Sequence, residues 1–278
     1  MYVAWHKRLC KHVVIKEILC SPSISTALHR NEAEALKNIK CTSLPQVFDF
    51  YMDRDRSFTV LEYIEGESLD ALLKQKKKFS RSELLRWFYR LADSLEVIHN
   101  NNVCHRDIKP ANIVLRPTGD VCLIDFNSAL VRGNNTGVIS RSLAYASPEQ
   151  YAYFRLCDNI DGGNTSAAVR NTIDFSTDSA CITVQVAEKE VMYRPITYNI
   201  NWNLSDIYSL GATMYHLLTG IRPPELLLED IVFPTTSTSN PEVSGIPDAI
   251  RKCMKINPSE RFNSACELRI ALYKLFTP

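Results

Sequence analysis

Residues 105–112 read His105-Arg106-Asp107-Ile108-Lys109-Pro110-Ala111-Asn112, and Asp125-Phe126-Asn127 begins 18 residues after Asp107. Between the two motifs lie two short apolar runs, 113–115 and 121–124, and the five residues that join them include a proline and a glycine. This pattern is typical of two strands joined by a tight turn. Folding the hairpin back brings Asn112 beside Asp125, so the stretch fixes a local fold and pairs two oxygen-bearing side chains.

Asn112 and Asp125 carry the kind of oxygen atoms that suit a magnesium ion. Mg²⁺ prefers oxygen ligands and completes its octahedral shell with water and nucleotide phosphates. Asp107 lies five residues before Asn112, on the loop that leads into the hairpin. It can therefore face the same space without binding the metal, and a carboxylate in that place is suited to accept a proton from a hydroxyl group.

These residues resemble the catalytic loop and the metal-binding aspartate motif of the eukaryotic-type serine/threonine protein kinase family. The resemblance runs from about residue 3 to residue 275, with its motifs in the family's order. It implies an α+β fold of two lobes, with a small β-rich N-lobe over residues 1–64 and a larger α-helical C-lobe over residues 65–278. The implied reaction is transfer of the γ-phosphoryl group of ATP, with Mg²⁺ as cofactor, to serine or threonine hydroxyls of a protein substrate.

Two N-lobe motifs supply residues that would hold the phosphates. Val13-Val14-Ile15-Lys16 resembles the strand whose lysine grips the nucleotide phosphates. Residues 25–40 predict a helix, and Glu32 falls on its apolar stripe with Leu28, Ala35 and Ile39. Because a buried glutamate needs a cationic partner, and because the family has such a pair, the resemblance implies contact between Lys16 and Glu32.

Strands are predicted at about residues 46–52 and 57–62, and the stretch Leu61 to Gly66 that follows resembles the hinge between kinase lobes. In the family the hinge backbone binds the adenine. The resemblance therefore implies that the Glu62 carbonyl and the Ile64 amide make those hydrogen bonds, with Leu61 guarding the pocket behind.

The C-lobe motifs are mainly structural. Ser80-Arg81-Ser82-Glu83 is a capping box, and it predicts a core helix with apolar residues at steps of three and four, namely Leu84, Phe88, Leu91, Leu95 and Ile98. The segment Ser147-Pro148-Glu149 resembles the family's Ala-Pro-Glu motif, which implies a tie from Glu149 to Arg261. Asp206 resembles the central-helix aspartate that braces the catalytic loop.

The resemblance also implies the remaining roles at the site. Asp107 accepts or orients the hydroxyl proton, Asn112 and Asp125 hold Mg²⁺, and Lys109 offsets charge on the transferring phosphate. Lys109 marks the serine/threonine branch, and Ser142 would help to seat the substrate. Beside Arg106, an activation loop over about residues 128–147 offers two candidate phosphorylation sites, Thr136 and Ser140.

Three features depart from the family. The resemblance starts at the strand-like Tyr2-Val3-Ala4-Trp5, without the first strand and the glycine-rich loop, so either those lie upstream of Met1 or the phosphate site is open. Asn127 stands where the family has glycine, which predicts a strained backbone there, although asparagine tolerates positive φ better than most residues. An insertion at about residues 155–200 would be a mobile or disordered segment or a docking site for a partner, with a small hairpin near residues 181–186.

Composition is ordinary for a globular chain of 278 residues, with 45% hydrophobic and 23% charged residues. The formal net charge of +1 argues against a nucleic-acid-binding surface. No stretch approaches the roughly 20 apolar residues of a membrane span. The nine cysteines are scattered without metal-like spacing, and the start of the chain does not resemble a secretory signal, so we expect a cytoplasmic protein with reduced thiols.

Two other functions stay open at this point. A pseudokinase, which keeps the fold as a nucleotide-binding or scaffold module, is favoured by the missing glycine-rich loop and by Asn127. A small-molecule phosphotransferase on a related fold is the other, and the Lys109-Pro110 pair and the Ser147-Pro148-Glu149 segment argue against it. The protein substrate, the activating signal and the oligomeric state are not encoded in any pattern that we recognise.

Overall fold

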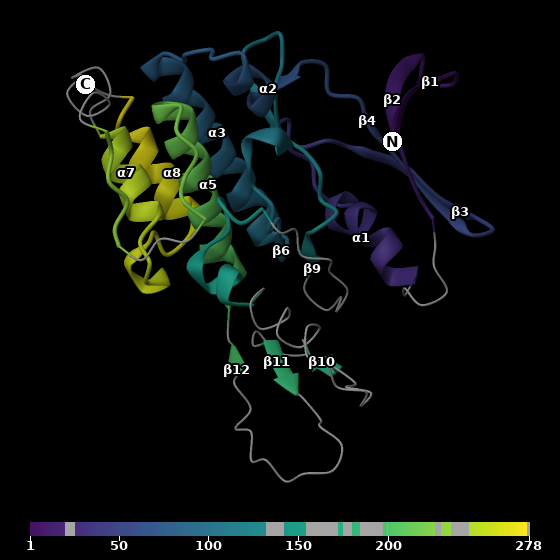
Figure 1. Ribbon diagram of the computed structural model, residues 1–278. Coiled ribbons are helices and arrows are strands. Elements are labelled where there is room, and N and C mark those ends of the chain that lie inside the picture. The colour runs from purple at the N-terminus through teal and green to yellow at the C-terminus, as the bar shows by residue number, and fades with distance from the viewer. Residues whose placement is uncertain are drawn as a thin grey trace.

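The computed structural model describes residues 1–19, 26–131, 142–153, 172–174, 180–183, 197–198, 200–225, 229–234 and 245–276. Figure 1 shows two lobes side by side, with the first four strands and one helix in one lobe and most of the helices in the other. The expected α+β fold with a small β-rich N-lobe and a helical C-lobe is confirmed.

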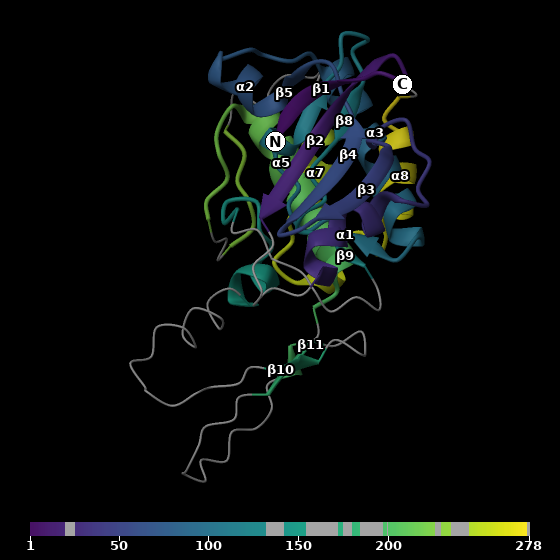
Figure 2. The same ribbon diagram turned by 90° about the vertical axis from the view of Figure 1, so that its right-hand side faces the viewer.

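The N-lobe is built on an antiparallel sheet with the strand order β1-β2-β4-β3. Figure 2 shows this sheet face-on, with C-lobe helices behind it. Strand β2 is rich in β-branched residues, as strands are, and it pairs along β4 so that Lys16 lies opposite Thr59. The four strands are β1 (Tyr2–His6), β2 (Lys11–Leu19), β3 (Val47–Asp53) and β4 (Arg56–Glu62).

Strand β1 lies at one edge of this sheet. Its side chains Val3 and Trp5 are 54% and 55% exposed, whereas Val13 on the neighbouring strand β2 is buried. Strand β1 therefore forms one edge of the described sheet and carries an exposed apolar strip.

Helix α1 (Thr26–Leu36) packs against β3 and β4 and also contacts β9 (Leu130–Val131) of the other lobe. It ends four residues before the predicted end at Lys40, because residues 37–38 form a turn and the amide of Ile39 binds the carbonyl of Leu36. Asparagine at position 38 favours such a turn over a continuing helix. The predicted apolar stripe is nevertheless present where it is described, since Glu32, Ala35 and Ile39 are all buried.

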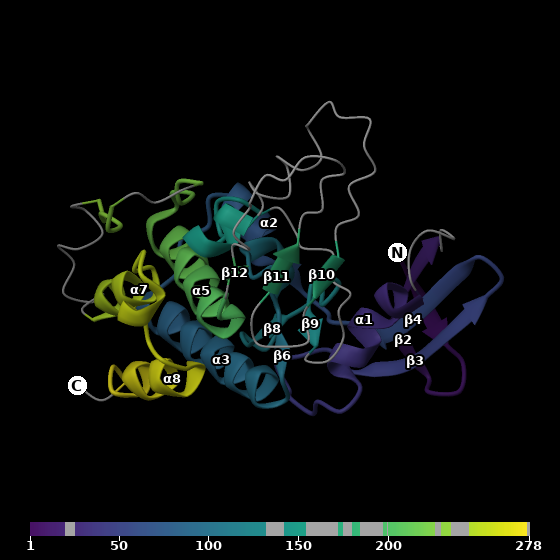
Figure 3. The same ribbon diagram turned by 90° about the horizontal axis from the view of Figure 1, so that it is seen from below.

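The C-lobe core forms around helix α3 (Arg81–Asn100), which packs against α5 (Trp202–Thr219) and α8 (Ala265–Tyr273). Figure 3 shows these helices gathered at one end of the molecule and the N-lobe sheet at the other. The predicted capping box is present at the start of α3, with the Ser80 side chain and the Glu83 side chain each binding the other residue's backbone. Helices α2 (Leu69–Lys74) and α7 (Ile246–Cys253) also belong to this lobe.

Short strands carry the residues that the sequence predicts for the active site. The predicted hairpin consists of β7 (Ile113–Leu115) and β8 (Val121–Leu123), joined to β5 (Glu67–Ser68) in one small sheet. Strand β6 (Val103–Cys104) pairs with β9. A one-turn 3-10 helix, Pro110–Asn112, leads from the loop after β6 into β7.

Within the expected insertion the structure describes three short antiparallel strands, β10 (Thr172–Asp174), β11 (Ala180–Thr183) and β12 (Thr197–Tyr198), in the order β10-β11-β12. Figure 1 shows them apart from both lobes. The hairpin predicted near residues 181–186 is present in its first part, and the rest lies outside the described residues. Across the described ranges, no helix combines the length and the apolar character needed to cross a membrane.

Gly66 closes the link between the lobes and needs to be glycine. Its φ is +141°, and a Cβ built on it would lie 2.0 Å from the carbonyl oxygen of Leu115. That oxygen belongs to the backbone of the catalytic hairpin and cannot turn aside.

We therefore expect Gly66→Ala to lower the free energy of unfolding by more than about 1 kcal/mol, because both the dihedral and the space exclude a side chain. Chemical denaturation followed by circular dichroism measures it. Gly220→Ala is the matched control: its φ is also positive, at +70°, but nothing lies within 4 Å of its Cβ position. An equal loss in the two variants would show that the close contact with Leu115 does not matter.

Candidate active site

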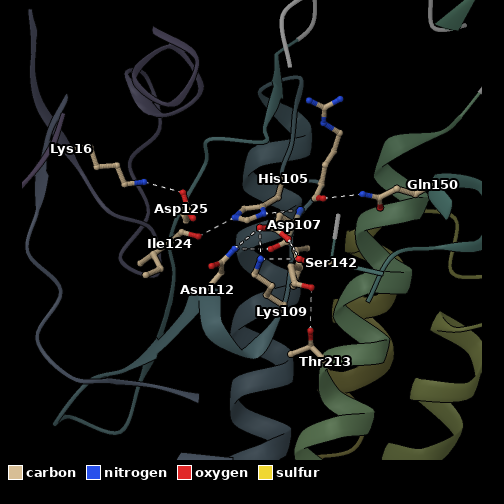
Figure 4. A network of polar contacts seen from close by, with 12 residues as sticks. Lys16, His105, Asp107, Lys109, Asn112, Ile124, Asp125, Ser142, Gln150 and Thr213 are labelled. Carbon is tan, nitrogen blue, oxygen red and sulfur yellow. Dashed lines mark hydrogen bonds and ion pairs between the residues drawn. The ribbon is translucent and has the colours of Figure 1, made fainter. Parts of the chain in front are cut away.

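The carboxylate of Asp107 is held in one orientation by side chains from three places. Its Oδ2 accepts hydrogen bonds from Lys109 Nζ at 2.8 Å and from Asn112 Nδ2 at 2.9 Å. Its Oδ1 accepts a hydrogen bond from the Ser142 hydroxyl at 2.7 Å, and Lys109 also donates to that hydroxyl at 2.8 Å. Figure 4 shows this cluster, and Asp107 itself is only 8% exposed. The sequence predicted all four residues, and the structure brings them together.

Asp206 holds the backbone of the loop that carries Asp107. It lies on α5 with 0% exposure, and its two oxygens accept the amide hydrogens of His105 and Arg106, each at 2.8 Å. His99 Nε2 lies 3.0 Å from the same carboxylate. Arg106 has a φ of +61°, which a residue with a side chain adopts only where its surroundings hold it. The contact between Asp206 and the catalytic loop that the resemblance implies is present.

Asn112 and Asp125 lie side by side, as the hairpin predicted. The amide of Ile124 donates to the Asn112 carbonyl at 2.8 Å, which sets the next residue, Asp125, against the start of β7. The Asn112 side chain donates through Nδ2 to both the carbonyl and the carboxylate of Asp107. Figure 4 shows its amide oxygen turned away from Asp107.

This donor set fits a magnesium ion. One carboxylate and one amide oxygen are hard ligands, and they leave most of an octahedral shell for water and phosphate oxygens. Among the described residues, no group of three or more His, Cys, Asp or Glu side chains is placed to hold a metal ion. An ion at Asn112 and Asp125 would therefore complete its shell with water or with oxygens from a nucleotide.

Lys16 joins the N-lobe to this centre. Its Nζ lies 2.6 Å from Glu32 Oε1 and 2.9 Å from Asp125 Oδ1, with the Lys16 and Glu32 side chains 12% and 4% exposed. The pair implied by the resemblance is present, and Figure 4 shows Lys16 reaching across to Asp125.

Electrostatics at these three groups favour a lysine ammonium between carboxylates. Burial alone would lower the pKa of Lys16, but the charges of Glu32 and Asp125 outweigh it and raise that pKa. Burial would raise the pKa of Asp125, but Lys16 outweighs it and holds that pKa below its usual value. For Glu32 burial dominates and raises the pKa, in keeping with an Oε2 atom that has no hydrogen-bond partner among the described residues.

A contact between the rings of His105 and Phe126 connects the catalytic loop to the segment that contains Asp125. Their centroids lie 4.6 Å apart in an edge-to-face arrangement, and both side chains are completely buried. Burial lowers the pKa of His105, so the neutral imidazole is favoured. The amide of Phe126 donates to Glu32 Oε1 at 3.0 Å. One hydrogen bond therefore links the ring contact to the ion pair between Glu32 and Lys16.

The hinge residues follow the end of strand β4. Leu61 is 4% exposed, and the Glu62 amide donates to the Gln46 carbonyl at 2.8 Å. Ile64 lies two residues beyond the strand, in a stretch without regular structure. Tyr63, between Glu62 and Ile64, is 39% exposed, so its side chain points to solvent. The side chains of Glu62 and Ile64 are less exposed.

The tie between Glu149 and Arg261 is present and buried. Arg261 donates from Nη1 and Nη2 to the two oxygens of Glu149, at 2.6 and 2.9 Å. The same guanidinium also binds the carbonyls of Leu204, Lys255 and Ile256, and its side chain is 0% exposed. A charge in this position is fully paired, so the tie is structural, as predicted.

Two residues of the site have no predicted role. Gln150 Nε2 donates to the Arg106 carbonyl at 3.0 Å, and Ser205 donates to Gln150 Oε1 at 3.2 Å, so a buried amide links the catalytic loop to α5. Asn31, next to Glu32, binds two carbonyls after Asp125. For Gln150 the only sequence signal was its place directly after Glu149.

The candidate phosphorylation sites Thr136 and Ser140 lie outside the described residues. The guanidinium of Arg106, which the resemblance placed near them, is 2% exposed. It donates through Nε to the Ser128 carbonyl at 2.7 Å and lies 5.2 Å from the centroid of the Trp202 ring. Burial lowers its pKa to about 10, so the group stays charged near neutral pH.

A family model for the protein kinase domain matches residues 1–161. The chain belongs to the protein kinase family. It is 30% identical over 251 positions to serine/threonine-protein kinase PknA of Nostoc sp., an alignment that covers 87% of this chain and 37% of that protein. It is 26% identical over 298 positions to serine/threonine-protein kinase PknD of Chlamydia trachomatis, covering 98% of this chain and 29% of that protein.

An Aurora kinase of Yarrowia lipolytica is 25% identical over 246 positions, covering 84% of this chain and 53% of that protein. The relatives thus come from bacteria and from a yeast. This kinase chain spans about a third of the length of the two bacterial relatives, 37% and 29%.

One expectation about this kinase is wrong. Asn127, in the glycine position of the family motif, is not among the residues with positive φ; the left-handed residue is Asp125, with φ +68°. The interactions of Asp125 with Lys16 and with the Asn127 amide hold that conformation. Asn127 therefore adds no backbone strain.

It follows that Asn127→Gly does not relieve anything in this kinase. We expect it to lower the free energy of unfolding by about 0.4–1 kcal/mol, because glycine raises the entropy of the unfolded chain, and to leave phosphate transfer no faster. Urea titration and a steady-state phosphorylation assay measure the two effects. A gain in rate would mean that the motif needs the conformations that only glycine reaches.

Proposed function

We propose that this chain is a serine/threonine protein kinase that transfers the γ-phosphoryl group of ATP to serine or threonine hydroxyls of a protein. The observation that carries the proposal is the carboxylate of Asp107, fixed by Lys109 and Ser142, next to the oxygens of Asn112 and Asp125. A proton acceptor and a cation site, held on one loop and one hairpin, are what transfer of a phosphoryl group to a hydroxyl requires. Both bacterial relatives above are named serine/threonine-protein kinases.

In the proposed complex the nucleotide lies between the lobes. Lys16 binds its phosphates while it stays paired with Glu32, and the backbone of Glu62 and Ile64 binds the adenine in front of Leu61. Asp125 and the amide oxygen of Asn112 would hold Mg²⁺, and the ion would supply positive charge to offset that of the phosphate oxygens. The raised pKa of Lys16 supports this role, because the group enters the site as an ammonium.

Asp107 orients the acceptor hydroxyl and takes its proton. The hydroxyl of Ser142 already donates to Asp107 Oδ1 at 2.7 Å, so the carboxylate is positioned to accept from an aliphatic alcohol. Lys109 contacts both groups and lies where it would offset the negative charge that develops during transfer. Ser142 would seat the substrate residue beside them.

A scaffold function without catalysis has less support. The five residues that a phosphoryl-transfer site needs, Lys16, Glu32, Asp107, Asn112 and Asp125, are present and in contact within one connected network. The comparisons offer nothing that favours a pseudokinase or a small-molecule phosphotransferase.

The other parts of the chain complete the proposal. The lobes divide near residue 64, Thr136 or Ser140 receives an activating phosphate near Arg106, and the insertion at about residues 155–200 offers β10–β12 as a docking site for a partner. Free thiols support a cytoplasmic location, and they are found at Cys10, Cys41, Cys104, Cys122, Cys253 and Cys266. The proposed partner is a protein substrate and not a nucleic acid.

The test is transfer of labelled γ-phosphate from Mg-ATP to a generic basic protein substrate. Asp107→Asn keeps the size of the side chain and removes the proton acceptor, so we expect the rate to fall by about 10²–10⁴-fold while binding of ATP is retained. Equilibrium binding of a fluorescent ATP analogue checks the second point.

Asp230→Asn is the matched control, since it makes the same chemical change in a surface ion pair with Lys255. Equal rates for wild type and Asp107→Asn, or no transfer by the wild type, would contradict the proposed function.

A further inference from the structure

Asn31 is a buried polar residue that the roles above do not use. It is 1% exposed on helix α1, directly before Glu32. Its Nδ2 atom donates to the Ala129 carbonyl at 2.6 Å and to the Asn127 carbonyl at 3.2 Å. One side chain of the N-lobe helix therefore binds two backbone groups that directly follow the metal-binding aspartate.

The segment that Asn31 binds is a closed turn, residues 126–129, here termed the metal-motif turn. The amide of Ala129 donates to the Phe126 carbonyl at 3.0 Å and closes it. The amide of Phe126, at its start, donates to Glu32. Neighbouring residues of α1 thus hold both ends of the turn, Glu32 the first and Asn31 the last.

Residues of the turn contact the catalytic centre on two sides. On one side, the amide of Asn127 hydrogen-bonds the carboxylate of Asp125. On the other, the carbonyl of Ser128 accepts a hydrogen bond from Arg106, next to Asp107 in the catalytic loop. A shift of the turn would therefore move the cation-binding carboxylate relative to Lys16 and relative to the catalytic loop.

The contacts of Asn31 indicate that its structural role is to donate hydrogen bonds. Its Oδ1 atom is buried and has no hydrogen-bond partner among the described residues. An unpartnered buried oxygen lowers stability, and a leucine of similar size would avoid that cost. An amide is favoured here because its NH₂ group satisfies the buried carbonyl of Ala129 and the partly buried carbonyl of Asn127 at once.

We propose that Asn31 is a positioning residue that locks helix α1 to the metal-motif turn, so that Lys16, Glu32 and Asp125 keep a single arrangement. The inference rests on the proposed kinase function for its effect on catalysis. Because Asn31 binds backbone carbonyls, the lock works with asparagine at position 127 as it would with glycine. Asn31 touches neither of the proposed substrates.

Asn31→Asp is the most direct variant. It keeps the size of the side chain and replaces the NH₂ group by an oxygen: when ionised it cannot donate and sets a negative charge against two carbonyl oxygens and Glu32, and when protonated it can donate only one hydrogen bond in place of two. We expect kcat to fall at least tenfold and the Mg²⁺ concentration for half-maximal rate to rise at least threefold. The KM for the protein substrate should change less than twofold, because Asp107 and Ser142 stay in place on the C-lobe.

Asn31→Leu separates the loss of the two hydrogen bonds from the added charge, and we expect the same split between kcat and KM with a smaller loss of kcat. Asn101→Asp is the matched control: Asn101 also donates through Nδ2 to a carbonyl, that of Val97 at 2.8 Å, but it lies at the end of α3 and away from the site. All rates are measured at a temperature where circular dichroism shows every variant to be folded.

Hydrogen exchange followed by mass spectrometry tests the lock without any need for activity. In both Asn31 variants, peptides that cover the metal-motif turn and α1 should exchange faster together, while peptides from α3 keep their wild-type protection. In Asn101→Asp the turn and α1 should be unchanged. This readout stays decisive even if the wild type transfers no phosphate, a result that would remove the proposed function alone.

The inference is overturned if the folded Asn31→Asp variant keeps the wild-type kcat and Mg²⁺ dependence. It is equally overturned if Asn101→Asp shows the same losses, since the effect would then be general destabilisation. Wild-type exchange rates in the turn of both Asn31 variants would also overturn it, whatever the kinetics show.

Discussion

The active centre of this kinase domain depends on one buried carboxylate. Asp206 has no exposed surface, and its two oxygens bind the backbone amides of His105 and Arg106. A buried charge is tolerated only when hydrogen bonds replace its lost hydration, so the carboxylate and the loop stabilise each other. Since Arg106 lies in the left-handed region, the loop would not hold this shape alone. The orientation of Asp107, one residue further on, follows from this contact.

From that loop a continuous set of contacts leads into the N-lobe. The ring of His105 meets Phe126, the amide of Phe126 meets Glu32, and Glu32 holds Lys16. Each step joins residues that are far apart in the sequence: a ring contact is followed by a hydrogen bond and then by an ion pair. The ring contact excludes water, and a charge pair in a drier place interacts more strongly. The two lobes are therefore coupled through the site itself.

Much of this arrangement was predictable from the sequence, because the decisive residues belong to motifs that fix both residue type and spacing. The Lys16–Glu32 pair and the tie from Glu149 to Arg261 join side chains of opposite charge, and Asp206, which binds backbone amides, was found through its family motif. Asn31 and Gln150 escaped prediction because they bind backbone carbonyls, which look the same in every sequence. Likewise, the residue type at position 127 said nothing about φ at Asp125, since that dihedral is set by tertiary contacts of the aspartate.

Two left-handed residues, Arg106 and Asp125, lie at the two ends of the stretch that contains the catalytic hairpin. Such a conformation costs about 1–3 kcal/mol for a residue with a side chain. In the folded state the surrounding hydrogen bonds have to offset that cost. The backbone of the site is thus strained at these two residues, whereas the helices around α3 contain no residue with a positive φ. On warming, the catalytic loop and the neighbouring residues Asn112 and Asp125 should relax before the helical core melts, so that the site would lose its geometry while most of the secondary structure is still intact.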